Sequence, residues 1–122
     1  MKITLPWPDK RLSPNAKRRK HWRTYQPAIN ADRTASKMLT FDAMQKHLAT
    51  QSHFAGDEPI AMTVTFFPPD RRHRDDDGMI GSFKHARDGI ADALGVDDRR
   101  FRPHYFFAEP EKPGRVVVEI GG

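Results

Sequence analysis

Apolar residues in this chain recur at two spacings, which predict strands in some segments and helices in others. Alternation or short apolar runs predict four β-strands, over residues 3–7, 61–67, 104–108 and 115–120. Prolines follow the first two segments, and a proline has no N–H to donate to a sheet ladder. A turn at residues 109–114 joins the last two strands.

Spacings of three and four residues predict two helices. The first covers residues 32–50 and packs one apolar face into the core. That face consists of Met38, Phe41, Met44 and Leu48. The second helix covers residues 77–94 and ends at Gly95, a usual position for glycine. Residues 9–29 lack a sustained period and contain Pro14 and Pro27, so we expect a mobile basic arm there.

The order of these elements is strand, arm, helix, strand, helix, strand, strand. It predicts an α+β fold with a small mixed sheet of about four strands packed with two α-helices. By length, residues 1–122 form a single domain, which buries roughly two-thirds of its unfolded surface. The strand–helix–strand unit is expected to cross over right-handed.

Composition narrows the setting in which the chain works. It contains no cysteine, which excludes disulfides and zinc–thiolate sites and fits a reducing compartment. No apolar run is long enough to cross a bilayer, and no secretory-type segment opens the sequence. We therefore expect a cytoplasmic protein with no membrane partner.

The charge of the chain indicates a polyanionic partner. The formal net charge is +5, and lysine and arginine gain affinity for nucleic acid by releasing its condensed counterions. The densest basic run is Lys17, Arg18, Arg19 and Lys20. Trp22 follows it and could stack on a base or sugar. We interpret the run as a phosphate-binding segment, with a solvated surface loop as the alternative.

The stretch from Arg71 to Asp77 sets a cationic run against three carboxylates where the second strand ends. In an extended or turn segment positions i and i+2 share a side, so Asp75 and Asp77 can converge on one cation. Oxygen ligands suit Mg²⁺, which takes one or two carboxylates and completes its sphere with water and substrate phosphate. Arg71, Arg72 and Arg74 could hold that phosphate.

Three consecutive acids also suit a solvated run at a helix start, with Asp77 at the N-cap. A second acidic pair, Asp97-Asp98, follows the intervening helix and favours a site instead. On a helical projection Asp77, Lys84 and Asp88 fall in one sector, so they can line one edge of that site. Lys84 and Asp88 could instead form an ordinary exposed ion pair, worth roughly 0.2–0.5 kcal/mol.

Three stretches of the sequence carry a family resemblance. They are ITLPWP at residues 3–8, continued by Ser13-Pro14-Asn15 and the basic run, then PDRRHRDDD at residues 69–77, and DALGVDD at residues 92–98. Together they resemble the first strand and junction-contacting arm, the core motif and the acidic pair of the RusA family of Holliday-junction resolvases, often encoded by phages and prophages. The chain departs from that family in a longer helix and in Gly78, where the family commonly has asparagine.

The resemblance implies a homodimeric, Mg²⁺-dependent endodeoxyribonuclease that resolves four-way DNA junctions by paired phosphodiester hydrolysis, in DNA recombination and repair. Mn²⁺ would be able to replace Mg²⁺. Asp75, Asp77 and Asp98 would be the catalytic metal ligands, and Lys84 the catalytic lysine. The DNA-binding residues would be Asn15, Lys17, Arg18, Arg19, Lys20, Arg71, Arg72 and Arg74.

Two other functions fit the same residues. A basic DNA-binding protein without catalysis would use the aspartates only to cap the helix and to offset nearby arginines. A metal nuclease acting on flaps or other branched DNA would use the same carboxylates. Metal dependence separates the first of these from a nuclease, whereas the choice between junction and flap depends on dimer geometry.

Overall fold

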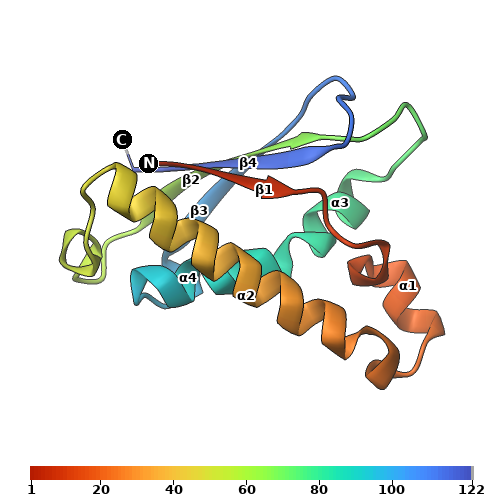
Figure 1. Ribbon diagram of the computed structural model, residues 1–122, viewed down its shortest axis with the longest axis horizontal. Helices are drawn as coiled ribbons and strands as arrows, with labels where there is room; N and C mark the ends of the chain where they lie inside the picture. Colours follow the sequence, from red (N-terminus) through yellow and green to blue (C-terminus); the bar gives the residue numbers. More distant parts are fainter. Residues whose placement is uncertain (122) are drawn as a thin grey trace.

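Four strands form one mixed sheet in the computed structural model, which describes residues 1–121 except for the side chain of Arg19. The strands are β1 (Lys2–Pro6), β2 (Ile60–Phe67), β3 (Phe101–Phe107) and β4 (Arg115–Ile120), in the spatial order β1-β4-β2-β3 (Figure 1). Strand β4 runs antiparallel to both of its neighbours, whereas β2 and β3 are parallel. This confirms the expected mixed sheet.

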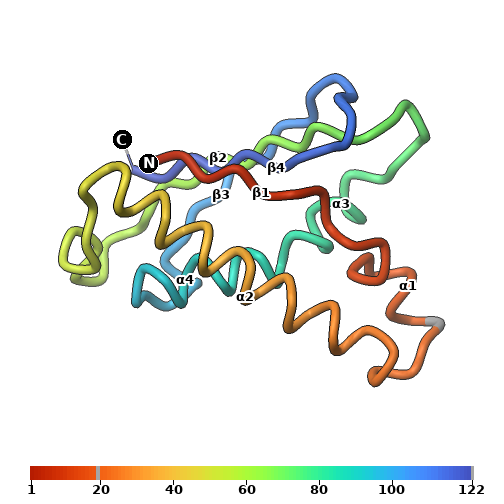
Figure 2. The backbone as a smooth tube through the Cα atoms, in the orientation of Figure 1, coloured from red at the N-terminus to blue at the C-terminus, as the bar shows by residue number. Residues whose placement is uncertain are grey.

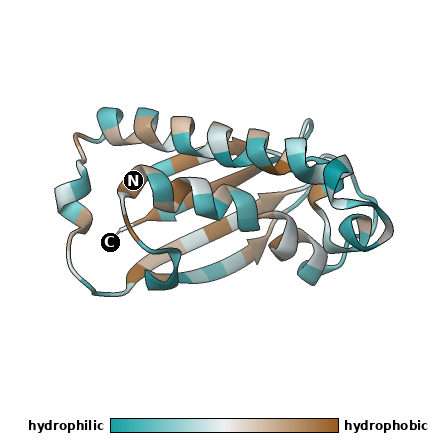
Figure 3. Ribbon diagram, turned by 90° about the horizontal axis from the view of Figure 1, so that it is seen from below, coloured by the Kyte–Doolittle hydropathy of each residue, from teal (hydrophilic) through white to brown (hydrophobic). Residues whose placement is uncertain are grey.

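The α-helices are α1 (Pro14–Arg19), α2 (Trp22–Lys46), α3 (Asp76–Ser82) and α4 (Lys84–Leu94). Three short 3-10 helices, η1 (Lys10–Leu12), η2 (Gln51–Phe54) and η3 (Asp98–Arg100), complete the described elements. The long helix α2 and helix α4 lie side by side over one face of the sheet (Figure 3). The fold is therefore α+β, one domain with a four-stranded mixed sheet packed against two main helices, as expected.

The core lies between the sheet and these helices because alternate strand residues point to the covered face. Strand β2 contributes Met62, Val64 and Phe66, each at most 1% exposed. Ile90 and Leu94 of α4 are fully buried against them. The alternation that predicted the strands therefore also predicted the side they bury.

Helices α2 and α4 approach closely at Gly89. A Cβ added at Gly89 would lie 2.0 Å from the Ser36 Oγ and 2.2 Å from the Arg33 carbonyl oxygen, which no side chain tolerates. The Ser36 hydroxyl donates to the Ala86 carbonyl oxygen at 2.8 Å, and Arg33 pairs with Asp92 at 2.7 Å beside this contact. Small residues thus set the spacing between the two helices.

The helix predicted for residues 32–50 corresponds to the second half of α2, which ends earlier, at Lys46, and the face assigned to its core was wrong. Met38 is 61% exposed, Phe41 37% and Leu48 85%, and only Met44 of the predicted face is buried. The packed face also contains Ser36, Thr40 and Ala43. Periodicity identified an apolar stripe, but close contact with α4 at Gly89 selected a different, smaller-residue face for the core.

The expected mobile arm at residues 9–29 was also wrong, because this segment forms η1, α1 and the start of α2 (Figure 2). The backbone N–H of Ala16 donates to the Ser13 Oγ at 3.2 Å, and Pro14 occupies the first turn of α1. A serine cap followed by proline is a helix-start signal that the lack of periodicity obscured. Helix α2 continues through Pro27.

The single helix predicted over residues 77–94 is two helices that meet at Phe83. The Phe83 N–H donates to the Ile80 carbonyl at 3.2 Å, a three-residue spacing, while its ring packs edge-on against Phe66 with a centroid distance of 6.3 Å. The regular four-residue hydrogen-bond spacing of an α-helix is interrupted at this buried residue. Asp77 and Lys84 therefore lie on different helices, and the projection that put them in one sector does not apply.

The last two predicted strands are confirmed, but they are not neighbours in the sheet. Strand β2 lies between β3 and β4, so the connection at residues 109–114 crosses the end of β2. The Glu111 N–H donates to the Pro68 carbonyl at 2.7 Å, which holds the crossing against β2. Within residues 1–121, no helix combines the length and the apolar character needed to cross a membrane.

Candidate active site

The loop that follows β2 is held in shape by Asp70 and Arg74. The Asp70 carboxylate accepts the Arg72 N–H at 3.0 Å and pairs with Arg74 at 3.0 Å, and these interactions lower the pKa of Asp70. Arg74 also donates to the carbonyls of Asp70 and Arg72, and its guanidinium lies 5.5 Å from the Trp7 ring centroid. The Arg74 side chain is only 19% exposed, and its contacts stabilise the loop. It is therefore not free to bind a phosphate.

Asp75 and Asp77 lie where this loop enters α3. Asp75 occupies the N-cap position, but its side chain makes no capping hydrogen bond, and its nearest ionic contact is the His73 Nε2 at 3.4 Å. Asp76 and Asp77 fall in the first turn of α3, where the positive end of the backbone dipoles favours anions. All three carboxylates are exposed. They are free to take an external ligand.

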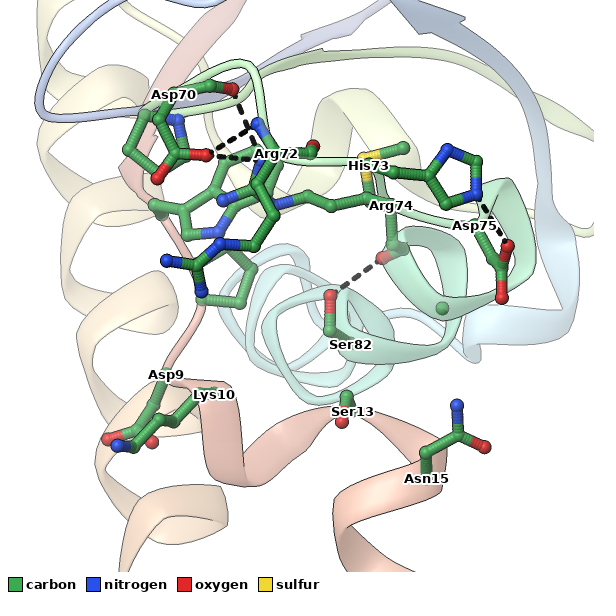
Figure 4. A pocket seen from close by; sticks show the side chains of 15 residues that line it. Asp9, Lys10, Ser13, Asn15, Asp70, Arg72, His73, Arg74, Asp75 and Ser82 are labelled. Carbon is green, nitrogen blue, oxygen red and sulfur yellow. Dashed lines mark hydrogen bonds and ion pairs between the residues drawn. The ribbon is translucent and has the colours of Figure 1, made fainter.

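Two cavities adjoin these carboxylates. One, of about 750 Å³, lies between residues 7–15 and the loop 69–79, and Asp75 lines it (Figure 4). The other, of about 650 Å³, is lined by all three aspartates together with Asn15 and Arg18 of α1. Carboxylates on one wall and an amide and a guanidinium on the other suit a phosphate held beside a cation.

Asp98 is positioned by α4 and not by the loop. Arg87 donates to the Asp98 carbonyl at 3.0 Å and approaches its carboxylate at 3.8 Å. The neighbouring Asp97 caps η3 by accepting the Arg99 N–H at 2.9 Å, so it is committed to the local turn and its pKa is lowered. Of the predicted acidic pair, only Asp98 is therefore available as a ligand.

The structure brings Asp75 and Asp77 together but does not group Asp98 with them. Asp98 lines neither cavity. Across residues 1–121, no three His, Asp or Glu side chains stand close enough to hold a metal ion. The donors of the Asp75–Asp77 pair still fit Mg²⁺, because that ion commonly uses one or two carboxylates and fills its remaining positions with water and phosphate oxygens.

Lys84 is the first residue of α4 and is exposed. Its positive charge acts to lower the pKa values of Lys17 and Asp88. Asp88 has a raised pKa, first because of desolvation and then because of the Asp98 carboxylate. The charges of both Lys84 and Asp98 therefore act on the Asp88 carboxyl group. Neither cavity at Asp75 and Asp77 is lined by Lys84.

The predicted DNA-binding residues divide into two groups. Arg18 and Lys20 of the basic segment are exposed, as are Asn15, Arg71 and Arg72. Lys17 instead turns inward, where its ammonium donates to the His85 Nε2 and lies 6.0 Å from the Tyr25 ring centroid. The side chain of Arg19 lies outside the described residues. The exposed group can meet DNA, whereas Lys17 joins α1 to α4.

Sequence reasoning missed Asp32, a half-buried carboxylate on α2. Desolvation, followed by the charge of Asp9, raises the pKa of Asp32 to about 6. Its Oδ2 is buried without a hydrogen-bond partner among the described residues. Burial also lowers the pKa of His85 to about 4, with the Lys17 and Lys84 charges adding to the effect. No spacing or motif marks either residue, because their burial arises from tertiary packing.

We expect Asp32→Asn to stabilise the protein at neutral pH and to have little effect near pH 4. The folded pKa of about 6 exceeds the unfolded value of 3.8, so stability falls as pH rises between them and stays lower above pH 6. Two pKa units correspond to an upper limit of about 3 kcal/mol, which solvent screening of a partly exposed group reduces to roughly 1–2 kcal/mol. Urea unfolding of both proteins at pH 4 and pH 8 measures this. An equal gain at both pH values would contradict it.

Comparison with known proteins places the chain in a family. The class defined so far is a single α+β domain with carboxylates at a loop–helix junction beside a basic segment. A protein of Xylella fastidiosa (strain Temecula1), described as an uncharacterized protein, is 41% identical to the chain over 121 residues, which cover 98% of the chain and 75% of that protein. The chain belongs to the same family as this Xylella protein. No protein-family model matches it.

Proposed function

We propose that this protein is a Mg²⁺-dependent endodeoxyribonuclease that cuts branched DNA, resolving four-way junctions by paired phosphodiester hydrolysis. The observation that carries the proposal is the cavity in which the exposed carboxylates of Asp75 and Asp77 face Asn15 and Arg18 of a basic segment. The resemblance of residues 69–77 and 92–98 to the RusA family supports the same chemistry. The protein would work in the cytoplasm of a bacterial host.

In this proposal the carboxylates hold the cation. Asp75 and Asp77 would hold it from the junction between the loop and α3. The resemblance to the RusA family makes Asp98 the third carboxylate, which lies outside both cavities in this structure. When bound, Mg²⁺ or Mn²⁺ supplies charge neutralisation at the scissile phosphate and lowers the pKa of water, which makes hydrolysis feasible at neutral pH. Arg87 orients Asp98 through its contacts with the Asp98 carbonyl and carboxylate.

The remaining residues bind and orient the DNA. Arg18 and Arg72 would contact phosphates at the cavities that they line. Lys20 and Arg71 are exposed near them in the sequence and would contact phosphates further along the DNA. By the resemblance to the RusA family, Lys84 at the start of α4 would stabilise the developing negative charge on the phosphate, although it lines neither cavity in this structure. The contact of Lys17 with His85 keeps α1 in place against α4, so the basic segment presents a fixed surface.

A cleavage assay on several DNA forms tests the proposal. Labelled four-way junctions, flaps and linear duplexes are incubated with the protein in Mg²⁺ and, separately, in a chelator. We expect Mg²⁺-dependent product from the four-way junction and little from linear duplex. Binding of the junction without product would favour the non-catalytic DNA-binding alternative, which the position of Asp76 and Asp77 in the first turn of α3 also suits. Product from flaps alone would favour a flap nuclease.

We expect Arg18→Ala with Lys20→Ala to weaken binding to every DNA form and to flatten its salt dependence. Each lost phosphate contact reduces the slope of log K against log salt by up to about 0.9. A matched control, Lys2→Ala with Lys46→Ala, removes the same charge at two residues that line neither cavity. Fluorescence anisotropy over a salt series measures both. Equal slopes in the two double variants would show that the basic segment contributes only general charge.

A further inference from the structure

The outward face of α2 and the turn that follows it carry uncharged residues where a surface helix usually carries charges. Six exposed positions follow the alternating spacing of three and four residues that defines the seam of a coiled coil. They are Ala31, Thr34, Met38, Phe41, Gln45 and Leu48. No helix or strand is drawn in front of α2 in Figure 1. We call these six residues the α2 seam.

Three of the seam residues are large and apolar. Met38 is 61% exposed and Leu48 85%, and Phe41 shows 37% of its surface. Leu48 follows the last turn with a φ of +52°, a left-handed conformation that leucine rarely adopts and that directs its side chain outward at the end of the helix. Such a line of exposed apolar side chains marks an interaction surface more than a solvated helix face.

We infer that the α2 seam is the contact between two copies of this chain, with the two α2 helices side by side and parallel. The charges beside the seam favour this occupant. In a parallel pair, the residue before one seam position lies opposite the residue five places further along the partner. Lys37 would therefore face Asp42 of the second copy, on both sides of the two-fold axis. An antiparallel pair would instead bring each Lys37 toward its own equivalent.

These two side chains are available for the pairing. Lys37 lies along the seam with its Nζ 5.9 Å from the Phe41 ring centroid. Asp42 is 56% exposed and pairs with Lys46 of its own helix at 3.1 Å. Exposed pairs of this kind contribute little affinity on their own but do select partner orientation.

The parallel arrangement also deepens the proposed function, on which this part of the argument rests. Helix α1, whose Asn15 and Arg18 line one of the cavities, lies by the amino-terminal half of α2 (Figure 2). A parallel pair would bring both carboxylate sites to one end of the dimer. An antiparallel pair would separate them by up to the length of α2, about 37 Å for 25 residues. Two opposed incisions near one junction need the closer arrangement.

Mass in solution, measured without DNA or metal, tests the contact independently of any cleavage. At tens of micromolar we expect light scattering to give twice the 14.0 kDa of one chain. Met38→Glu with Phe41→Glu should reduce this to a single chain, while circular dichroism stays that of the parent. Phe106→Glu is the matched control, because Phe106 is 55% exposed on β3 and lies off the seam, so its variant should remain a dimer.

Cross-linking tests the relative orientation of the two α2 helices. Because the chain has no native cysteine, any disulfide formed must involve the introduced cysteine. We expect Ala31→Cys and Gln45→Cys each to form a disulfide-linked dimer on mild oxidation, because equivalent residues near both ends of the seam face each other only in a parallel pair. Phe106→Cys should not cross-link. Lys37→Glu should weaken the dimer, and adding Asp42→Lys should restore it. A single chain at every concentration, or no more cross-linking at the seam than at Phe106, would overturn the inference, even if the protein cleaves junctions.

Discussion

Asp77→Asn is expected to abolish junction cleavage while leaving junction binding intact or tighter. The substitution keeps the size of the side chain but removes the charge that holds the cation, and it also removes repulsion of the DNA phosphate. Loss of an electrostatic group of this kind lowers the rate by on the order of 100-fold or more. Asp75→Asn and Asp98→Asn should behave in the same way. Single-turnover cleavage and anisotropy, run on the same preparations, measure rate and affinity.

The control for these variants is Asp57→Asn, which makes the same charge change in an exposed turn before β2, away from both cavities. It should cut at the parental rate. Normal cleavage by Asp98→Asn would restrict the site to Asp75 and Asp77, which is the pair that the structure brings together. Normal cleavage by Asp77→Asn would contradict the site itself.

Gly89→Ala is expected to destabilise the fold strongly. The new Cβ would lie 2.2 Å from the Arg33 carbonyl oxygen, which belongs to the backbone of α2 and cannot turn away. Separating α2 from α4 would cost about 3 kcal/mol or more, as severe overpacking does. For a domain of this length that corresponds to a fall in Tm of roughly 10 °C. Calorimetry or thermal circular dichroism measures it.

Gly78→Ala provides the comparison, because a Cβ at Gly78 in α3 would have no atom within 4 Å. Replacing a helical glycine by alanine in open space stabilises by about 0.5–1 kcal/mol. The two variants should therefore shift Tm in opposite directions. Equal shifts would show that α2 and α4 are not in the close contact described at Gly89.

Much of the sheet could be predicted from the sequence, because alternation reports directly which strand residues are buried. The order of the strands in the sheet could not be predicted, because the placement of β2 between β3 and β4 depends on pairing between segments that are distant in the sequence. For α2 the sequence correctly predicted a helix, but it predicted the wrong face of that helix to be buried. Met38 and Phe41 are more apolar than Ser36 and Thr40, yet the smaller pair faces α4 because Gly89 permits close approach.

The candidate site shows a similar division. Asp75 and Asp77 could be located from the sequence because prolines end β2 and the acids follow within one loop. The association of Asp98 with Arg87 and Asp88 depends on how η3 folds back along α4. The break at Phe83, which moves Lys84 onto a separate helix, depends on the packing of its ring against Phe66. Neither has a local signal in the sequence.

The proposed hydrolysis of junction DNA with a metal held by the aspartates is tested most directly on a fixed four-way junction in which each strand is end-labelled in turn, with Mg²⁺ and with a chelator. We expect Mg²⁺-dependent cuts at symmetric positions on one opposed pair of strands and none on the other pair. Tight junction binding with no cut on any strand, in Mg²⁺ or Mn²⁺, would contradict it.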